Sequence, residues 1–321
     1  MRERFAADWT KVWPSSSPVG IAVSGGPDSL ALLLLAASIA PGSVFAATVD
    51  HGLRRESAHE AAAMATLCAQ RGIFHTTLTV DLPKGPALQE RARAVRYAAL
   101  GEWAEAQGLK AVAAAHHADD QAETLLMRLN RGAGARGLAA MRAVAAVPGY
   151  PGLVLLRPLL GWRRGDLAQI VADAGVNPVD DPSNRDARFE RARLRQDLAG
   201  TPWLDVAAIA ASASHLADAD LAIDWAAGRA LDAVSLDGKT LRWAPDQTPR
   251  AIALRVLERI IVRLGGSAPR GSAVARWHDL LAAGGVATLA GVRGDGREPL
   301  WQFGAAPAPR SGQKVCPKKG P

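Results

Sequence analysis

The chain has 321 residues and a net charge of +7, from 38 Lys and Arg residues against 31 Asp and Glu residues. Hydrophobic residues make up 49% and charged residues 21%, which excludes a wholly disordered chain. The length suggests about two domains. The positive charge favours an anionic partner such as a nucleic acid.

Cysteine content and apolar runs limit the class of protein further. Cys68 and Cys316 are too few for a disulfide framework, a cysteine-rich zinc site or an iron–sulfur cluster. Residues 1–13 are polar and mixed in charge, unlike a secretory signal peptide. The longest apolar run, residues 30–40, is shorter than the ~20 residues that span a bilayer. We therefore expect a soluble, cytoplasmic protein with no membrane partner.

The first half of the chain alternates short apolar runs with helical patterns. We expect strands over residues 19–23, 43–49, 74–80 and 111–115, and helices over residues 28–39, 57–71, 87–107 and 118–130. Such alternation is typical of a parallel sheet with helices on both faces. The sequence therefore predicts a doubly wound α/β domain over residues 1–200.

The second half follows a different pattern after the Gly200-Thr201-Pro202 break. We expect a long helix over residues 205–231, a strand over 240–243, and helices over 250–264 and 272–281. These elements predict a second, smaller, mainly helical domain over residues 205–304. Residues 305–321 are rich in Pro and Ala and then basic, and we expect a disordered tail there.

A glycine turn follows the first expected strand, with the residues Ser24, Gly25, Gly26, Pro27, Asp28 and Ser29. Consecutive glycines permit backbone N–H groups to converge on an anion, and the following helix adds the positive end of its dipole. The two serines can supply hydroxyl donors, and Asp28 can hold a magnesium ion that bridges phosphates. An ordinary capped turn is the alternative for a bare Gly-Gly pair. The complete string resembles the PP-loop of the ATP pyrophosphatases, which implies ATP cleavage between the α and β phosphates.

Four further stretches narrow the resemblance. They are residues 49–54, which include Asp50 and His51, residues 89–97, residues 116–124, and the Asp180–Asn184 stretch with the arginines that follow it. Asp50 and His51 close a strand at the sheet edge where α/β proteins bind ligands. In this order and spacing, the stretches resemble the tRNA(Ile)-lysidine synthetase family. The likeness covers residues 19–196 well and extends loosely to about residue 291.

This resemblance implies a fold, a reaction and its partners. The fold is that of adenine nucleotide alpha-hydrolase-like PP-loop proteins. ATP, with Mg²⁺, activates the C2 oxygen of the wobble cytidine in the CAU anticodon of tRNA(Ile), and L-lysine then displaces AMP. The product, lysidine, changes the codon and aminoacylation specificity from Met to Ile. A homodimer is a further possibility that the sequence leaves open.

Asp120 and Glu123 are the candidate lysine-binding residues. Their spacing places them on one helical face, where two carboxylates can grip an ammonium group or, at Asp120 and Asp28, a magnesium ion. They can also help a lysine amine to lose its proton before it attacks. The alternative is that they only lie at an exposed helix start, where acidic side chains interact favourably with the helix dipole. The match to the family's string favours the functional role.

The remaining candidate residues surround these carboxylates. Arg96 matches a family pattern and can stabilise charge on the α-phosphate. His116, His117 and Asp119 belong to the same active-site string, and we expect one histidine to approach the nucleotide while the other packs structurally. Zinc is disfavoured, because adjacent histidines point in different directions and cysteine partners are missing.

Basic residues near the expected site are candidates for tRNA binding, since arginines suit phosphates. They are Arg128, Arg131, Arg191 and Arg195. Ala192 departs from the family, which usually has an asparagine there. A PP-loop tRNA thiolase is the nearest alternative, although its chemistry needs paired cysteines or a cluster. A catalytically inactive module that binds tRNA or nucleotide is the second alternative, against which Asp28, Asp120 and Glu123 together argue.

Overall fold

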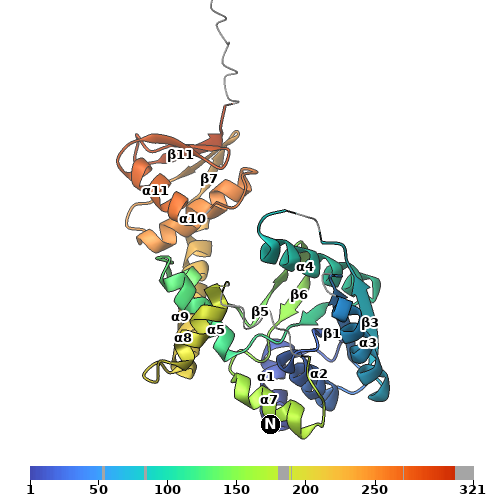
Figure 1. The fold of residues 1–321 in the computed structure, drawn as a ribbon. Helices are drawn as coiled ribbons and strands as arrows, with labels where there is room; N and C mark the ends of the chain where they lie inside the picture. The colour runs from blue at the N-terminus through green and yellow to red at the C-terminus, as the bar shows by residue number, and fades with distance from the viewer. Residues whose placement is uncertain (53–54, 83–84, 180–187, 189, 270, 308–321) are drawn as a thin grey trace, which may run out of the picture. The chain divides into compact units, whose positions relative to one another are not determined.

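The protein is described from a computed structural model that covers residues 1–52, 55–82, 85–179, 188, 190–269 and 271–307 (Figure 1). The chain divides into two compact units, Met1–Ala217 and Asp218–Pro321, each described by itself below. The Asp180–Asn184 stretch and most of the expected tail lie outside the described residues. The unit boundary falls within one long helix, later in the chain than the break expected near residue 201.

The first unit is built on a six-stranded sheet in the order β3-β2-β1-β4-β6-β5. Its strands are β1 (Val19–Ala22), β2 (Val44–Asp50), β3 (Phe74–Thr79), β4 (Ala111–Ala113), β5 (Val144–Val147) and β6 (Tyr150–Leu156). All neighbours pair in parallel except β5, which runs antiparallel to β6. The order reverses between β1 and β4, and ligands of such sheets bind at the carboxyl ends of the strands beside that point.

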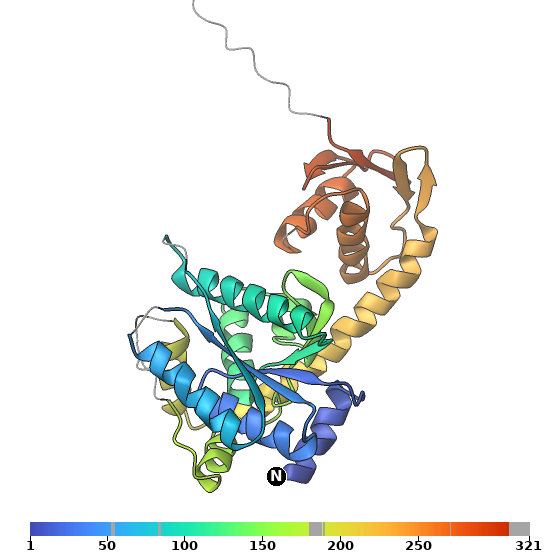
Figure 2. The ribbon, with the colours of Figure 1, turned by 90° about the vertical axis from the view of Figure 1, so that its right-hand side faces the viewer.

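Helices cover both faces of this sheet (Figure 2). One face carries α1 (Arg2–Val12), α2 (Pro27–Ile39), α3 (Arg55–Gln70) and α7 (Arg164–Asp173), which share an apolar core with β1. The other face carries α4 (Leu88–Ala106), whose Tyr97, Leu100 and Trp103 pack on the strands. The unit also contains α5 (Ala118–Leu129), α6 (Ala135–Leu138) and α8 (Glu190–Ala199). The doubly wound α/β fold is therefore confirmed, and each element expected up to residue 130 lies within two residues of its predicted bounds.

The long helix α9 (Val206–Ala230) belongs to both units. Within the first unit, Ala213 is fully buried in a small cluster with Leu125 and Ala140, and Ile209 and Leu216 pack beside it. The stretch Val206–Ala233 is the one described helix long and apolar enough to cross a membrane by length and composition alone. That criterion is weak, because helices of soluble proteins also meet it.

The second unit combines helices with a sheet that the sequence analysis largely missed. The described strands β7 (Ser235–Asp237), β8 (Thr240–Trp243), β9 (Val286–Leu289), β10 (Val292–Asp295) and β11 (Trp301–Ala305) form an antiparallel sheet in the order β7-β8-β11-β10-β9. Only β8 was expected. The helices α10 (Arg250–Arg263) and α11 (Gly271–Ala282) lie at their predicted positions and share one core with the sheet.

Candidate active site

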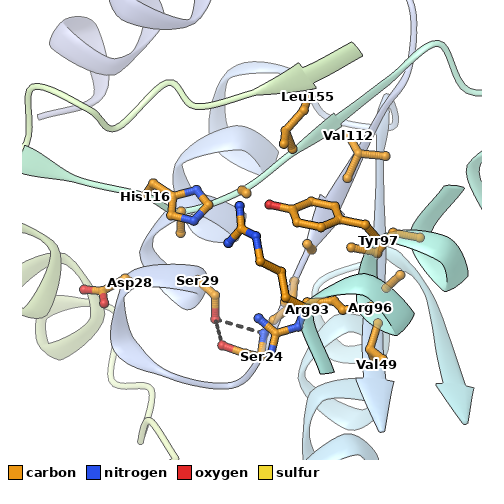
Figure 3. A pocket seen from close by; sticks show the side chains of 16 residues that line it. Ser24, Asp28, Ser29, Val49, Arg93, Arg96, Tyr97, Val112, His116 and Leu155 are labelled. Atoms are coloured by element: carbon orange, nitrogen blue, oxygen red, sulfur yellow. Dashed lines mark hydrogen bonds between the residues drawn. The ribbon is translucent and has the colours of Figure 1, made fainter. Parts of the chain in front are cut away.

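A cavity of about 220 Å³ opens at the carboxyl ends of β1, β2 and β4 (Figure 3). The glycine turn contributes Ser24, Asp28 and Ser29 to its wall, α4 contributes four further side chains, and the segment after β4 contributes His116. The α4 side chains are Arg93, Arg96, Tyr97 and Leu100. Val49, at the end of β2, also lines the cavity, which therefore joins four of the stretches that the sequence analysis singled out.

The turn between β1 and α2 is held by its own side chains. Gly25 has a φ of +84°, and a Cβ there would lie 2.9 Å from Cγ2 of Val179, so a glycine is needed. The Ser24 N–H donates to Oγ of Ser29 at 3.1 Å, and the Ser29 hydroxyl donates to the Gly26 carbonyl at 2.9 Å. Ser29 thus ties the loop together, and its hydroxyl proton is not directed at a ligand as expected.

Asp28 stands in the first turn of α2 with an uncompensated oxygen. Its Oδ1 is buried and has no hydrogen-bond partner among the described residues, while its Oδ2 lies 3.4 Å from Nε2 of His117. A buried carboxylate oxygen without a partner is costly unless a cation or donor binds it. The residue therefore fits the predicted role as a magnesium ligand.

His117 lies among three carboxylates. Its Nε2 is 3.4 Å from Asp28 and 3.5 Å from Asp120, and its Nδ1 is 3.5 Å from Asp119. Burial alone would lower the pKa of His117, but contacts with Asp119, Asp28 and Asp120 raise it to about 9. The contacts are longer than good hydrogen bonds, so they are mainly ionic. His117 is consequently a buried imidazolium at neutral pH.

His116 has the opposite surroundings. Its Nδ1 accepts a hydrogen bond of 3.2 Å from Nε of Arg157. Burial and the Arg157 charge lower the pKa of His116 to about 4. Of the two neighbouring histidines, the neutral His116 lines the cavity and the charged His117 is enclosed, with 1% of its surface exposed.

Arginines of α4 line the wall opposite the turn. Arg96 is exposed to solvent at the cavity wall; desolvation by its surroundings lowers its pKa, yet an arginine remains charged in a protein. Arg93 lies over the Tyr97 ring, with its Cζ 5.0 Å from the ring centroid. In Figure 3, the Arg96 guanidinium lies near Ser24 and that of Arg93 extends toward His116. Both positive groups thus face the space that an anionic ligand would fill.

Asp50 and His51 follow β2 at the same edge of the sheet. Oδ1 of Asp50 accepts hydrogen bonds from the Ser57 hydroxyl at 2.6 Å and the Gly52 N–H at 2.9 Å, which hold its pKa below the usual range. Asp50 therefore ties β2 to the start of α3. Both ring nitrogens of His51 are buried, and within the part of the chain that the structure describes they have no hydrogen-bond partner. Burial and the Arg96 charge lower the pKa of His51. His51 can accept or donate a hydrogen bond to a ligand.

Glu123 occupies a different place from the one expected. Its side chain is 1% exposed and accepts from Arg195 at 2.8 Å and 3.3 Å. Nε of Arg191 lies 3.6 Å away, and the Arg164 guanidinium lies 4.0 Å away. On α5, Asp120 thus faces His117, whereas Glu123 is enclosed by guanidinium groups.

The arginines expected to bind tRNA all have partners within the chain. Arg128 donates to the carbonyls of Gly137 and Ala140 at 2.8 Å and 2.9 Å, which fixes the turn around α6. Arg131 forms an ion pair with Glu190. Arg191 donates to the Thr124 hydroxyl at 2.9 Å. Together with Arg195, these contacts dock α8 on α5, where Ala192 is buried in place of the family's usual asparagine.

Sequence reasoning missed three arginines that shape the site. Arg157 fixes His116, Arg163 forms an ion pair with Asp119 at 3.2 Å, and Arg164 lies beside Glu123. Arg157 follows β6, and the apolar run of residues 153–156 that ends at this arginine was the available signal. Arg163 and Arg164 begin α7, and no local pattern links them to α5.

Comparisons with known proteins agree with this arrangement. Residues 1–201 match the model of the PP-loop domain. A curated tRNA(Ile)-lysidine synthase of Novosphingobium aromaticivorans is 56% identical over 97% of this chain and 95% of its own length. The curated tRNA(Ile)-lysidine synthase of Zymomonas mobilis is 44% identical over 92% of this chain and 90% of its own length. The chain belongs to the tRNA(Ile)-lysidine synthase family.

A solved structure supports the fold of this family member. The U34-tRNA thiolase NcsA from Methanococcus maripaludis, solved with its [4Fe-4S] cluster, matches 67% of this chain and 78% of its own with a TM-score of 0.54. The two sequences are 15% identical, so the likeness concerns the fold alone. Assignment to the lysidine synthase family rests instead on the curated relatives, which match nearly the whole chain.

Proposed function

We propose that this protein forms lysidine on tRNA(Ile) from ATP and L-lysine. The observation that carries the proposal is one cavity, lined by the PP-loop turn, Arg96 and His116, in a chain 56% identical over 97% of its length to a curated tRNA(Ile)-lysidine synthase. The reaction has two steps. The C2 oxygen of the wobble cytidine attacks the α-phosphate of ATP and releases pyrophosphate, and an amine of lysine then attacks C2 and releases AMP.

The chain's own groups suit the first step. The N-terminus of α2 and the turn before it present backbone N–H groups to phosphates. Arg96 lies on the facing wall, where a guanidinium stabilises charge that develops on a phosphoryl group. At the end of β2, His51 offers the nucleotide two buried ring nitrogens that no other described residue bonds.

Magnesium fits this site through Asp28, because its buried Oδ1 has no hydrogen-bond partner in the described ranges of the chain. Asp120 lies near enough to share a ligand with Asp28, since both approach Nε2 of His117. Among the described residues, no cluster of three or more His, Cys, Asp or Glu side chains is suited to hold a metal ion. Phosphate oxygens would therefore supply the remaining ligands, and the ion would neutralise phosphate charge.

The second step requires a neutral lysine amine, because an ammonium has no lone pair. Asp120 lies 3.5 Å from Nε2 of His117 at the start of α5, whereas Glu123 is paired with arginines. We infer that Asp120 meets the lysine amine, and that Glu123 acts by holding Arg191 and Arg195 in place.

The second unit is proposed to hold the tRNA body while the anticodon enters the cavity. If its contacts are mainly to phosphates, log affinity will fall with log salt by about 0.7 to 0.9 per phosphate neutralised. A chain ending at Ala217 is the fair comparison, because a cut at residue 201 would remove Ile209, Ala213 and Leu216 from their cluster on Leu125. The shorter chain should show a shallower salt slope with ATP binding intact. Equal slopes would contradict a tRNA-holding role.

Incubation of the protein with tRNA(Ile), ATP and lysine, followed by mass spectrometry of the nucleosides, tests the function. We expect cytidine at the wobble position to be converted to lysidine only when lysine is present. Without lysine, pyrophosphate should still exchange into ATP in the presence of tRNA. A thiolated nucleoside would support the thiolase alternative, and the absence of any exchange would support an inactive binding module.

The setting of this reaction is proposed to be the cytoplasm. The family relatives are bacterial tRNA-modifying enzymes, and their substrate tRNA is a cytoplasmic molecule. Fractionation of cells into soluble and membrane parts tests this, with the apolar stretch Val206–Ala233 as the reason to include the membrane fraction.

A further inference from the structure

The two neighbouring histidines after β4 have different surroundings. His117 is enclosed, and three aspartates lie within 3.5 Å of its ring. His116 instead lines the cavity and lies beside Arg157. Burial, and then the charges of Arg157, Arg93 and Arg191, lower the pKa of His116 to about 4, while Asp120 opposes that shift.

The contact between Arg157 and His116 determines where the imidazole proton lies. Nε of Arg157 is 3.2 Å from Nδ1 of His116. An arginine carries only donors, so Nδ1 must be the acceptor and cannot carry a proton. The single proton of the neutral ring therefore resides on Nε2.

Arg157 is itself held firmly in place. Its Nη1 donates to the Arg142 carbonyl at 2.7 Å, and the residue is 6% exposed. Its backbone N–H donates to Ala143 at 2.8 Å, directly after β6. Since β4 pairs with β6, and Ala114 donates to Leu156 at 2.9 Å, the residues that follow these two strands lie side by side.

His116 lines the ligand cavity, with Arg93 extending toward it (Figure 3). We propose that Arg157 is a positioning residue that fixes His116 as a neutral imidazole with its proton on Nε2, so that His116 donates a hydrogen bond to an oxygen of the bound substrate and does not act as a base. This inference rests on the proposed function for the identity of that oxygen. It is a phosphoryl oxygen of ATP or the cytidine C2 oxygen, both of which accept hydrogen bonds.

The first test replaces His116. The amide nitrogen of a glutamine can donate from about the position of Nε2, whereas alanine cannot donate. For ATP–pyrophosphate exchange with tRNA, we expect His116→Ala to lower kcat/KM by ~100-fold or more, as for loss of one oxyanion donor. His116→Gln should stay within ~10-fold of the unmodified protein, which sets it apart from alanine. If His116 were a base, glutamine would be as slow as alanine, and that result would overturn the proposal.

The second test observes the imidazole directly in the full chain. Two-bond ¹H–¹⁵N spectra of ¹⁵N-histidine-labelled protein report the protonated nitrogen, and loss of one of seven histidine signals in His116→Gln assigns His116. We expect the Nε2-protonated form from pH 6 to 8. An Nδ1-protonated or doubly protonated ring at pH 7 would overturn the assignment. These spectra require no enzymatic turnover. They therefore test the tautomer of His116 independently of whether the protein forms lysidine.

Variants of Arg157 complete the test. Arg157→Met removes the donor and the charge, so His116 should titrate nearer its ordinary range and populate both tautomers. Arg157→Lys keeps a donor and should retain the unmodified spectrum. Arg128→Met is the matched control, because it also loses a guanidinium that donates to backbone carbonyls, here those of Gly137 and Ala140, and the His116 signal should not change. If Arg157→Met leaves the His116 spectrum unaltered, Arg157 does not position it.

Discussion

Replacing Glu123 with glutamine separates a direct role in lysine binding from a role through arginines. Glutamine keeps the size of the side chain and one acceptor oxygen, but it loses the charge that holds Arg195 and Arg191. The carboxylate is 1% exposed, and its bonds to Arg195 measure 2.8 Å and 3.3 Å. Their loss should loosen α8 where it docks on α5.

The cost follows from burial on each side of the pair. Removing one partner of a fully buried ion pair costs about 3–5 kcal/mol. The Arg195 side chain is 30% exposed and that of Arg191 is 43% exposed, so both guanidinium groups can regain water. We therefore expect Glu123→Gln to lower the free energy of unfolding by about 2 kcal/mol. For a unit of this size, that corresponds to a fall in Tm of about 4–8 °C.

The matched control is Glu190→Gln. Glu190 pairs with Arg131, and the two side chains are 44% and 61% exposed. Exposed pairs contribute little, so the control should change stability by less than about 0.5 kcal/mol. Urea unfolding of both variants measures the difference, with the Tm as a second measure.

The functional assay compares pyrophosphate release with lysidine formation. If Glu123 acts through Arg195, then Glu123→Gln and Arg195→Met should impair the same step, and the double variant should be no slower than the slower single variant. If Glu123 contacts lysine itself, the fold-decreases in rate caused by Glu123→Gln and by Arg195→Met should multiply in the double variant. Multiplied losses, or a Glu123→Gln protein as stable as the Glu190→Gln control, would refute the reasoning.

Three further predictions concern other parts of the chain. Asp28→Asn should abolish ATP–pyrophosphate exchange while the protein stays folded, because Oδ1 has no hydrogen-bond partner among the described residues and only the 3.4 Å contact of Oδ2 with His117 is weakened; exchange at the unmodified rate would contradict this. Arg255→Met should cost about 3–5 kcal/mol in the second unit, since it leaves Asp220, 2% exposed, without the guanidinium 2.6 Å away. Hydrogen exchange along α10 measures that loss, and unchanged protection would refute it. Burial raises the pKa of Cys68 to about 11, so at pH 8 iodoacetamide should modify it in Cys316→Ser protein only after unfolding; rapid native labelling would show otherwise.

The predictable part of the fold is the part with local signals. Helices α2 to α5 and strands β1 to β4 have clear local patterns of apolar residues, glycine turns separate most of them, and all were placed within two residues. The hairpin β5–β6 was missed although Pro148-Gly149 marks its turn, where Gly149 has a φ of +84°. The strands of the second unit are only three to five residues long, and β8 pairs with β11, about 60 residues later. No short window of sequence contains that pairing.

The same division between local and distant signals explains the active site. Asp119, Asp120 and Glu123 are neighbours on α5, and from sequence they form one acidic run. The fold separates them, because Asp119 and Asp120 meet His117 while Glu123 meets α8. Those contacts involve residues up to 72 positions away, so their choice depends on tertiary structure.

The charged residues around the two histidines that follow β4 are likewise determined by tertiary structure. Neighbouring side chains on extended backbone point in opposite directions, so a pair of histidines at a strand end necessarily samples two environments. Here one environment is built from the carboxylates that begin α2 and α5, and the other from arginines of α4, α8 and the residue after β6. The sequence indicates that the two histidines differ, but only the strand order, with β6 beside β4, determines that His116 is the neutral one. A cavity lined by a neutral donor and arginines favours a polyanionic nucleotide, while the enclosed imidazolium balances aspartates that would otherwise repel it.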